Sequence, residues 1–285
     1  MFIINKLKKK ILDLALLIIK NHIKKQKSID IYVYNKEKDE ISPCNFKARS
    51  ITNLTSTQIS KTNDWGHLEQ IIDFKNKVVI DIGANVGFTT TYFSKISNKV
   101  IAFEPDNENY ESLNSQIKIR NLKNVETHNL AVSNISGPVE FYSRNANDLH
   151  SLGVHNKGKI IQTSHITAIT LDEFWGPSPQ YIGLIKIDVE GFEYEVLQGA
   201  SKLLEMRLVE AIIFEYSPKI HKLRKISEDA PIKLLKKYGY RIFNTSGFEI
   251  LEDNLVNVKV CDLIALNPEH SYISNIKKSG NRDYL

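Results

Sequence analysis

From Lys77 onward, short apolar segments alternate with longer segments in which apolar residues recur at helical spacing. The short segments are rich in β-branched residues, which is typical of strands. The predicted strands are 78–82, 99–103, 125–132, 183–189, 208–214, 240–243 and 258–266, and the predicted helices are 88–97, 107–119, 193–206 and segments of 218–238. Nearly continuous apolar strands separated by helices indicate a mostly parallel sheet buried on both faces. We therefore predict a doubly wound, Rossmann-like α/β fold.

Two departures from this alternation carry topological information. The last two predicted strands are joined by the turn-rich stretch 244–257, which contains no convincing helix, so we expect an antiparallel final strand. Between residues 137 and 170 the alternation breaks, and strand-like segments at 139–142 and 165–169 enclose a loop rich in Asn, His and Gly. This region is predicted to be a β excursion from the main sheet.

The predicted domain organisation follows these patterns. A main domain spans residues 76–270, with the excursion at 137–170 inside it, and 271–285 form a tail. Residues 28–75 form a lead-in region, with a strand at 31–34 and a helix near 65–74. Residues 1–27 have apolar positions at helical spacing among many lysines, which predicts a basic amphipathic helix.

The charge of the chain is concentrated at its N-terminal end. Residues 1–27 hold eight Lys and one acid, a net +7, whereas the whole chain has +5, so the remainder has −2. A nucleic-acid enzyme usually carries its basic surface on the body around the active site, so we expect no nucleic-acid partner. The 1–27 helix is expected to dock on the body or on a partner subunit of a homo-oligomer. Peripheral contact with an anionic membrane surface is the alternative.

The compartment is predicted from segments and cysteines. The apolar run of residues 11–19 is too short to span a bilayer, and no small-residue cleavage site follows it. Cys44 and Cys261 are far apart and match no metal-ligand spacing. Reduced thiols in a cytoplasmic protein are the simpler expectation.

The first chemical signal lies directly after the first predicted strand of the main domain, in Asp81-Ile-Gly-Ala-Asn-Val-Gly87. Glycines in a strand-to-helix turn allow a ligand to approach the backbone closely. The spacing is neither the Gly-x-Gly-x-x-Gly pattern nor the Gly-x-x-x-x-Gly-Lys pattern, so pyrophosphate and triphosphate cradles fit poorly. An ordinary tight turn is the alternative. The loop suits a ligand with an amino-acid moiety and no phosphate.

Glu104 ends the second strand and is followed by Pro105 and Asp106, which open the next helix. A carboxylate at this distance from the glycine loop can accept hydrogen bonds from both ribose hydroxyls of an adenosine. Glu104 and the loop together therefore predict a nucleoside site.

The fourth strand carries ionisable residues, in Ile185-Lys-Ile-Asp-Val-Glu-Gly-Phe-Glu193. Lys186 and Asp188 point to the same side of a strand with apolar neighbours, which costs desolvation energy unless they are paired or contact a ligand. A structural Lys–Asp pair is one interpretation. Glu190 and Glu193 could complement the dipole of the following helix, and Glu215 adds a carboxylate at the end of the fifth strand.

These segments together resemble the FkbM family of methyltransferases. The matching segments are Val79–Gly87, Phe103-Glu-Pro105, Asn129-Leu-Ala-Val-Ser133, Gly137–Tyr142, Ser151-Leu152, Thr170-Leu-Asp172 and Ile185–Ala200. They fall within residues 76–220, and the stretch from Asp188 to Ala200 is the most specific. The resemblance implies a Rossmann-like methyltransferase sheet, S-adenosylmethionine as cofactor, and O-methylation of a hydroxyl on a sugar, glycan or secondary metabolite. The cofactor-binding residues implied by the match are Asp81, Gly83, Ala84, Asn85, Gly87, Glu104, Asn129 and Ala131.

Methyl transfer to an alcohol requires an in-line arrangement and removal of the hydroxyl proton. Our hypothesis is that Lys186, Asp188 and Glu190 form the catalytic wall, and candidate bases are Lys186, Glu190 and three histidines of the excursion, His150, His155 and His165. Alternatively, Asp188 and Glu215 with a further oxygen ligand could hold a divalent cation that polarises the hydroxyl.

Two other functions are compatible with parts of the pattern. A nicotinamide-dependent oxidoreductase or sugar epimerase would use the same fold, but it is disfavoured by the missing Gly-x-Gly-x-x-Gly. A non-catalytic scaffold with a methyltransferase fold is disfavoured by the presence of Asp81, Glu104 and Asp188.

Overall fold

The computed structural model describes residues 28–35, 40–47, 68–69, 71–144, 160–177, 180–245, 247–250, 260–271 and 273. Three predictions lie outside these residues: the amphipathic helix of residues 1–27, the loop with His150 and His155, and nearly all of the tail 271–285. Among the described residues, no helix combines the length and apolar character that crossing a membrane requires.

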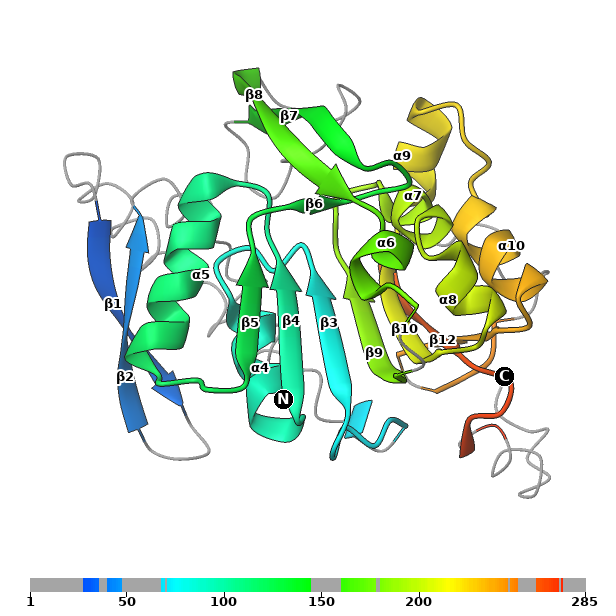
Figure 1. Ribbon diagram of the computed structural model, residues 1–285, viewed down its shortest axis with the longest axis horizontal. Coiled ribbons are helices and arrows are strands. Elements are labelled where there is room, and N and C mark those ends of the chain that lie inside the picture. Colours follow the sequence, from blue (N-terminus) through cyan, green and yellow to red (C-terminus); the bar gives the residue numbers. More distant parts are fainter. Residues whose placement is uncertain are drawn as a thin grey trace, which may run out of the picture.

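A seven-stranded sheet forms the centre of the molecule, in the order β11-β12-β10-β9-β3-β4-β5. Its strands are β3 (Val78–Ile82), β4 (Lys99–Phe103), β5 (Val125–His128), β9 (Ile182–Ile187), β10 (Val209–Tyr216), β11 (Arg241–Asn244) and β12 (Cys261–Leu266). The order reverses between β3 and β9, because β4 and β5 extend to one side of β3 and later strands to the other (Figure 1). In such sheets ligands bind beyond the carboxyl ends of the strands at this reversal.

The antiparallel final strand is confirmed. β12 pairs antiparallel with both of its neighbours, β10 and β11, whereas β10-β9, β9-β3, β3-β4 and β4-β5 are all parallel pairs. The fold is therefore the predicted doubly wound α/β sheet with a single reversed strand.

Helices cover both faces of the sheet. They are α4 (Phe88–Ile96), α5 (Asn107–Ile119), α6 (Leu171–Trp175), α7 (Glu193–Gln198), α8 (Ser201–Glu205), α9 (Pro218–Leu223) and α10 (Ala230–Lys237). Alternate residues of β3 point to opposite faces: Ile80 packs in the cluster with apolar residues of α6, α7, α8 and α10, and Val79 in the cluster with Phe93 of α4. Both faces are thus apolar, as the unbroken hydrophobic strands predicted.

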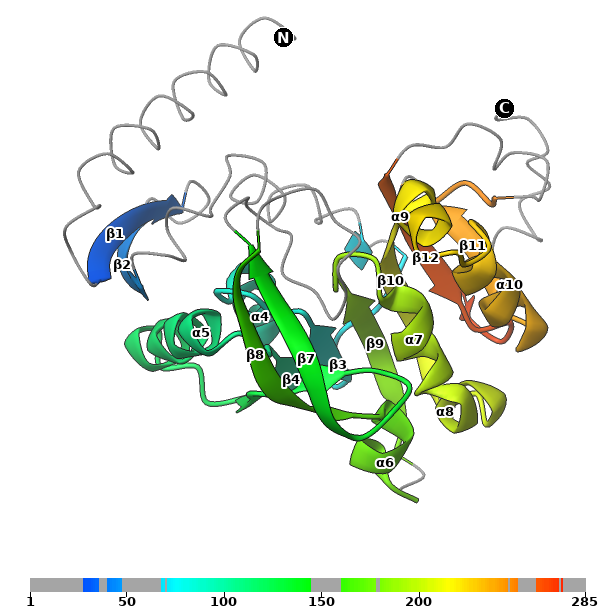
Figure 2. The same ribbon diagram turned by 90° about the horizontal axis from the view of Figure 1, so that it is seen from above.

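A second, three-stranded sheet has the order β6-β8-β7, with β6 (Ala131–Val132), β7 (Gly137–Arg144) and β8 (Ile160–Ile169). It is the predicted excursion, and in Figures 1 and 2 it lies over the carboxyl ends of β3 and β4. The prediction of one strand over 125–132 was wrong, because the chain leaves the main sheet after His128 and Ala131 pairs instead with Ala168 of β8.

The prediction of one helix over 193–206 was also wrong, since α7 and α8 are separate. Gly199 packs so closely against Ser133 that a Cβ atom would lie 2.0 Å from its carbonyl oxygen. The Asp172 carboxylate accepts hydrogen bonds from the backbone N–H groups of Lys202 (2.9 Å) and Leu203 (3.0 Å). A distant carboxylate therefore caps α8 and gives it a beginning of its own.

The lead-in region contains an antiparallel hairpin of β1 (Ser28–Asn35) and β2 (Glu40–Lys47), beside α5 in Figure 1. The predicted strand 31–34 lies within β1. Of the helix predicted near 65–74, the described residues show only a 3₁₀ turn at Leu68–Glu69, so that prediction was wrong for these residues. Ile72 and Phe74 are instead buried in the hydrophobic cluster that contains Phe93 of α4. Their burial places this segment against the sheet just before β3 begins.

Candidate active site at the carboxyl edge of the sheet

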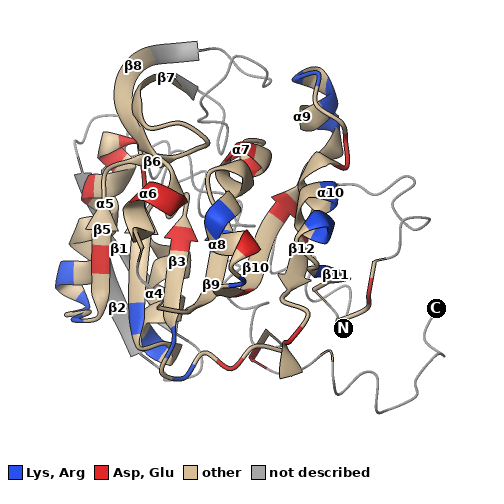
Figure 3. Cartoon of the chain, turned by 45° about the vertical axis from the view of Figure 1, so that its right-hand side comes forward, with Lys and Arg blue, Asp and Glu red and all other residues tan. Residues whose placement is uncertain are grey.

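Four neighbouring strands of the main sheet end in carboxylates or lead directly into one. Asp81 lies in β3, Glu104 follows β4, Asp188 follows β9 and Glu215 lies near the end of β10. Because these strands are parallel, their ends lie along one edge, as predicted. Figure 3 shows acidic positions at the end of β3 and on α6 and α7, and basic positions on α9 and α10.

The loop after β3 has the backbone conformation that its glycines permit. Gly83 has φ +78°, and a Cβ atom there would lie 1.9 Å from the Asp188 carbonyl oxygen. The backbone N–H groups of Gly83 and Ala84 donate to the Phe103 carbonyl, at 3.0 and 2.9 Å. The loop is thus fixed against the ends of both neighbouring strands, and only glycine fits at position 83.

The far end of the loop opens a helix. Gly87 has φ +94° and is the N-cap of α4, with no side-chain hydrogen bond capping the helix. Asn85 also has a positive φ, +51°, and its side-chain oxygen accepts from the Val86 N–H at 2.8 Å. The first-turn N–H groups of α4 therefore have no side-chain cap at the N-cap position, which suits a carboxylate ligand.

Glu104 is 5% exposed and holds the loop directly. Its Oε2 accepts from the Asn85 N–H at 2.7 Å, and its Oε1 accepts from the Asp106 N–H at 2.9 Å. Burial raises the pKa of Glu104 to about 8, although these two hydrogen bonds favour the ionised form. The Asn109 side chain also hydrogen-bonds this carboxylate, which in its ionised form keeps acceptor capacity for a hydroxyl donor.

Asn129 acts on the backbone that follows β4. Its Nδ2 donates to the carbonyl oxygens of Glu104 (2.9 Å) and Pro105 (3.2 Å). Ala131 is buried in β6, two residues farther along. Asn129 thus shapes the Glu104 segment, and its predicted contact with a cofactor stays a prediction, as does that of Ala131.

Asp81, Lys186 and Asp188 form a chain of charges across β3 and β9. Lys186 Nζ lies 3.4 Å from Asp81 Oδ1, 3.3 Å from Asp188 Oδ2 and 3.4 Å from the Gly83 carbonyl oxygen. Asp81 also accepts a hydrogen bond from the Thr90 hydroxyl of α4, at 2.6 Å. The exposed fraction of the side chain is 0% for Asp81, 6% for Lys186 and 32% for Asp188. Asp81 therefore supports the loop from inside, and Asp188 has access to solvent.

The protonation of Lys186 follows from this arrangement. Burial alone would lower its pKa, but the carboxylates of Asp188 and Asp81 raise the pKa above that of a free lysine. A lysine held as a cation has no lone pair with which to accept a proton. Lys186 thus fits the structural Lys–Asp interpretation and does not fit the role of a base.

The loop after β9 has an unusual conformation. Glu190 and Gly191 have consecutive positive φ angles, +54° and +96°. Glu193 is completely buried, and its Oε1 accepts from the N–H groups of Gly191 (3.0 Å) and Val189 (3.4 Å). Glu193 therefore shapes this loop in addition to lying in the first turn of α7. Glu190 is half-buried, and its predicted catalytic role stays a prediction.

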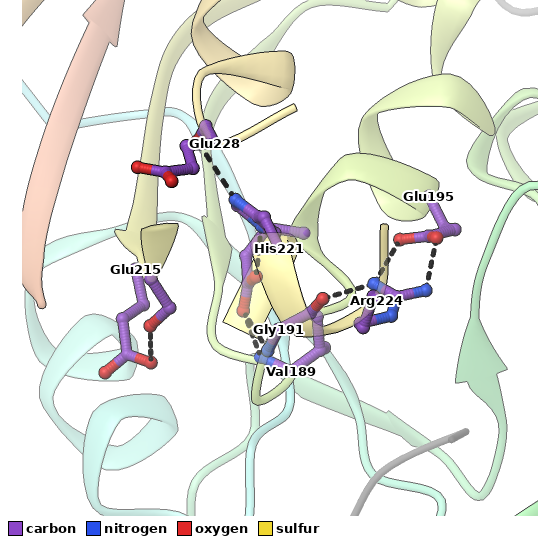
Figure 4. A network of polar contacts seen from close by, with 9 residues as sticks. Val189, Gly191, Glu195, Glu215, His221, Arg224 and Glu228 are labelled. Carbon is purple, nitrogen blue, oxygen red and sulfur yellow. Dashed lines mark hydrogen bonds and ion pairs between the residues drawn. The ribbon is translucent and has the colours of Figure 1, made fainter. Parts of the chain in front are cut away.

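Two side chains near the loop were missed by the sequence analysis. Arg224 donates to the Gly191 carbonyl and forms a two-pronged ion pair with Glu195, and His221 lies beside Glu193 (Figure 4). Both residues follow β10, about thirty positions farther along the chain than the loop. No motif or spacing marks them, because their partners come close only in the folded sheet.

The remaining candidates do not gather at one point. His165 is exposed in β8, and Glu215 accepts a hydrogen bond from the Ser217 hydroxyl at 3.0 Å. Within the part of the chain that the structure describes, no group of three or more His, Cys, Asp or Glu side chains is arranged to hold a metal ion. The predicted Asp188–Glu215 cation site thus has no third ligand of these types among those residues.

Comparison with known proteins supplies the family. The family model named "Methyltransferase FkbM domain" matches residues 81–242, more than half of the chain. This chain belongs to the FkbM methyltransferase family. The resemblance expected from the sequence is confirmed, and the matched range begins at Asp81 and contains Glu104, Asp188 and Glu193.

One curated relative of this FkbM-family chain is "Methyltransferase 1" of Beauveria bassiana (strain ARSEF 2860), with 26% identity over 142 residues. The match covers 42% of this chain and 57% of the relative, so the chain spans less than two thirds of that protein.

Two solved structures give similarly partial matches. SMU.1697c of Streptococcus mutans, in complex with SAH, has 14% identity and a TM-score of 0.42, and the match covers 75% of this chain and 98% of that one. The T. thermophilus 16S rRNA N2 G1207 methyltransferase RsmC, in complex with AdoMet and guanosine, has 10% identity and a TM-score of 0.48, over 85% and 51% of the two chains.

Proposed function

We propose that this protein is an S-adenosylmethionine-dependent methyltransferase that O-methylates a hydroxyl of a sugar, a glycan or a secondary metabolite. One observation carries the cofactor part: the Glu104 carboxylate lies against the Gly83–Gly87 loop and accepts the Asn85 N–H. A ribose acceptor and a loop for an amino-acid moiety are thereby joined at the sheet reversal. Membership of the FkbM methyltransferase family supports the same conclusion.

The described residues fit such a cofactor. Glu104 in its ionised form keeps acceptor capacity for a ribose hydroxyl, and the N-terminus of α4, which has no side-chain cap, faces the glycine loop. When bound, S-adenosylmethionine supplies a sulfonium methyl group for an in-line displacement. The buried Asp81 and Lys186 hold the loop and the end of β9 in a fixed relation, which keeps donor and acceptor sites in register.

The acceptor is proposed to lie beside Asp188 and Glu190. Asp188 is the most exposed member of its charge cluster, so its carboxylate can hydrogen-bond an incoming hydroxyl and take up its proton. Lys186 remains a cation next to it, with Nζ 3.3 Å from Asp188 Oδ2. Glu190 extends the acidic wall from the adjoining loop, at a half-buried position.

The cofactor is tested by ligand-dependent thermal shift. S-adenosylmethionine and S-adenosylhomocysteine are expected to raise the Tm of the full chain, and NAD is expected to leave it unchanged. Glu104→Gln, which removes the charge but keeps the shape, should reduce the shift. Stabilisation by NAD alone would favour an oxidoreductase or epimerase, and no shift with either sulfur nucleotide would favour a scaffold.

The catalytic wall is tested with Asp188→Ala and a labelled methyl donor, screened against cell-surface glycan precursors. Because Asp81 still pairs with the buried Lys186, the variant should fold, although the loss of the second carboxylate should lower its Tm. Turnover is expected to fall at least about 100-fold. An active Asp188→Ala variant would exclude Asp188 as the base, and full activity in the presence of a chelator would exclude the cation mechanism.

A further inference from the structure

We propose that His221 and Arg224 are positioning residues that fix the loop Asp188–Phe192, and through it the acceptor side of the active site. This inference rests on the proposed function, because it assigns a role to residues that hold Asp188 and Glu190 in place. Both residues come from α9 and the residue after it, on the far side of β10 in the sequence. They contact the same loop by two separate routes, and Figure 4 shows the contacts of Arg224 with Gly191 and Glu195.

The first route runs through Arg224. Its guanidinium donates to the Gly191 carbonyl and to both carboxylate oxygens of Glu195, with Nη1 to Oε2 at 3.0 Å. The same guanidinium lies over the Phe192 ring, 3.5 Å from its centre. The two charged side chains are only 12% and 14% exposed. A planar group that is bonded at its edge and stacked on its face has one orientation, so it transmits the position of α9 to the loop.

The second route runs through Glu193 and His221, which are both completely buried. Glu193 Oε1 accepts the Gly191 and Val189 N–H groups, while Oε2 lies 3.7 Å from His221 Nε2. Within the described residues, neither Glu193 Oε2 nor His221 Nε2 has a hydrogen-bond partner. Two buried polar atoms without hydrogen-bond partners are costly. At 3.7 Å the two atoms are within ion-pair range but too far apart for a hydrogen bond.

The other nitrogen of His221 shows which atom must carry a proton. His221 Nδ1 lies 3.2 Å from the Glu228 carbonyl oxygen. A carbonyl only accepts, so Nδ1 donates, and a neutral ring would then present a lone pair at Nε2 toward the Glu193 carboxylate. The second route therefore holds the loop through the Glu193 hydrogen bonds to the Gly191 and Val189 N–H groups, with His221 against the other carboxylate oxygen.

Substitutions at these residues can distinguish hydrogen bonding to the loop from simple packing beside it. Glu193→Gln keeps a side-chain oxygen for the Gly191 N–H and places an amide N–H on the side of His221 Nε2. Glu193→Leu has a similar volume and offers no hydrogen bond to the loop. His221→Leu removes the ring that lies against Glu193, and Arg224→Ala removes the first route. Arg207→Ala is the matched control, because Arg207 also pairs with a glutamate, Glu269, but at an exposed site.

The test is hydrogen exchange of the amides of residues 189–192 in the full chain, with S-adenosylhomocysteine affinity measured in parallel. Exchange of these amides should be at least about 10-fold faster in Glu193→Leu, His221→Leu and Arg224→Ala. It should stay within about 3-fold of the wild type in Glu193→Gln and Arg207→Ala. S-adenosylhomocysteine affinity should change less than about 3-fold in all five, since Glu104 and the glycine loop remain intact.

The outcomes distinguish this inference from the proposed function. Unchanged exchange in Glu193→Leu and Arg224→Ala would overturn the positioning role, whatever the cofactor. Equal acceleration in Glu193→Gln and Glu193→Leu would show that the Glu193 side-chain oxygen does not hold the loop, and would overturn the second route. If the wild type does not bind S-adenosylhomocysteine, the proposed function fails while the exchange data still decide the loop. With a methyl acceptor in hand, the three disruptive variants should lower kcat and leave the KM for S-adenosylmethionine nearly unchanged.

Discussion

The two halves of the carboxyl edge are built in different ways. On the cofactor side, Glu104 binds Asn85, nineteen positions away, and Asp81 binds Thr90, nine positions away. On the acceptor side, Arg224 reaches Gly191 and Glu195, thirty-three and twenty-nine positions away. Apart from the contacts of Lys186 with Asp81 and Gly83, the first half is held by consecutive elements, whereas the second depends on α9, which lies beyond β10 in the sequence. Neighbouring sites can therefore differ in what holds them, and this difference can be tested.

The largest effect is expected at Gly83, where the loop on the cofactor side packs against the Asp188 carbonyl on the acceptor side. Gly83→Ala would place a Cβ atom 1.9 Å from the Asp188 carbonyl, at φ +78°. The positive φ costs about 1–2 kcal/mol for alanine, and the overlap adds about 1–3 kcal/mol. We expect the free energy of unfolding, measured by urea denaturation, to fall by about 3 kcal/mol or more, with weakened binding on both sides.

Gly176→Ala is the matched control for this prediction. Gly176 has φ +67° and ψ −163°, a backbone conformation that residues other than glycine rarely adopt, and a Cβ atom added there would meet no atom of the described residues within 4 Å, so only a backbone cost of about 1–3 kcal/mol applies. Equal losses of unfolding free energy in the two variants would show that Gly83 is not tightly packed against Asp188.

The next largest effect concerns the local half alone. Glu104→Gln should weaken S-adenosylhomocysteine binding about 10- to 100-fold in calorimetry, because the amide replaces one acceptor oxygen with a donor, and a buried polar group left unsatisfied costs about 1–3 kcal/mol. Exchange of the loop 189–192 should stay unchanged, because Arg224 and Glu193 hold it independently. Faster exchange of this loop in Glu104→Gln would contradict the separation of the two halves.

The pH dependence of stability gives a second test of Glu104. Its pKa is raised by burial from the usual 4.5 to about 8, so between these values the folded protein holds a proton that the unfolded chain releases. Stability contributed by the protonated group is complete below pH 4.5 and is lost as pH rises through 8, by up to about 1.4 kcal/mol per pH unit. The ligand-free wild type should lose more stability than Glu104→Gln between pH 5 and 8 in denaturant titrations. If the unfolding free energy of the two proteins falls equally with pH, the raised pKa of Glu104 is contradicted.

A smaller effect is expected at Asn129. Asn129→Ala removes two hydrogen bonds to the carbonyls of Glu104 and Pro105, with an expected loss of about 1 kcal/mol in unfolding free energy. The loss should be accompanied by weaker S-adenosylhomocysteine binding, since the segment that it shapes carries Glu104. Unaltered binding would limit Asn129 to a structural role.

The smallest effect is expected away from both halves. Glu269→Ala breaks an ion pair with Arg207 whose side chains are 50% and 77% exposed. Solvent screens such pairs, so the unfolding free energy should change by less than about 0.5 kcal/mol. A larger change would show that distant surface charges also affect the sheet.

The difference between contacts made within consecutive elements and contacts made between distant ones explains which features could be predicted from the sequence. The bounds of β3, β4 and α5 and the positions of Asp81, Gly83 and Glu104 followed from local patterns of apolar residues, glycines and caps. The break between α7 and α8 did not, because it depends on Asp172 capping α8 from a distant segment. Nor did the roles of His221 and Arg224, which exist only once β10 lies beside β9. Local chemistry is visible along the chain, and tertiary contacts are not.

The position of β12 has a consequence for how the protein is made. Because β12 lies between β10 and β11, the main sheet is incomplete until residues 261–266 have left the ribosome. Until then β10 and β11 both expose an unpaired edge toward the gap, although β3, β4 and β9 can already pair. Open strand edges on a growing chain recruit other strands. A chain that ends before residue 261 would therefore have a nearly complete active-site edge and a tendency to aggregate.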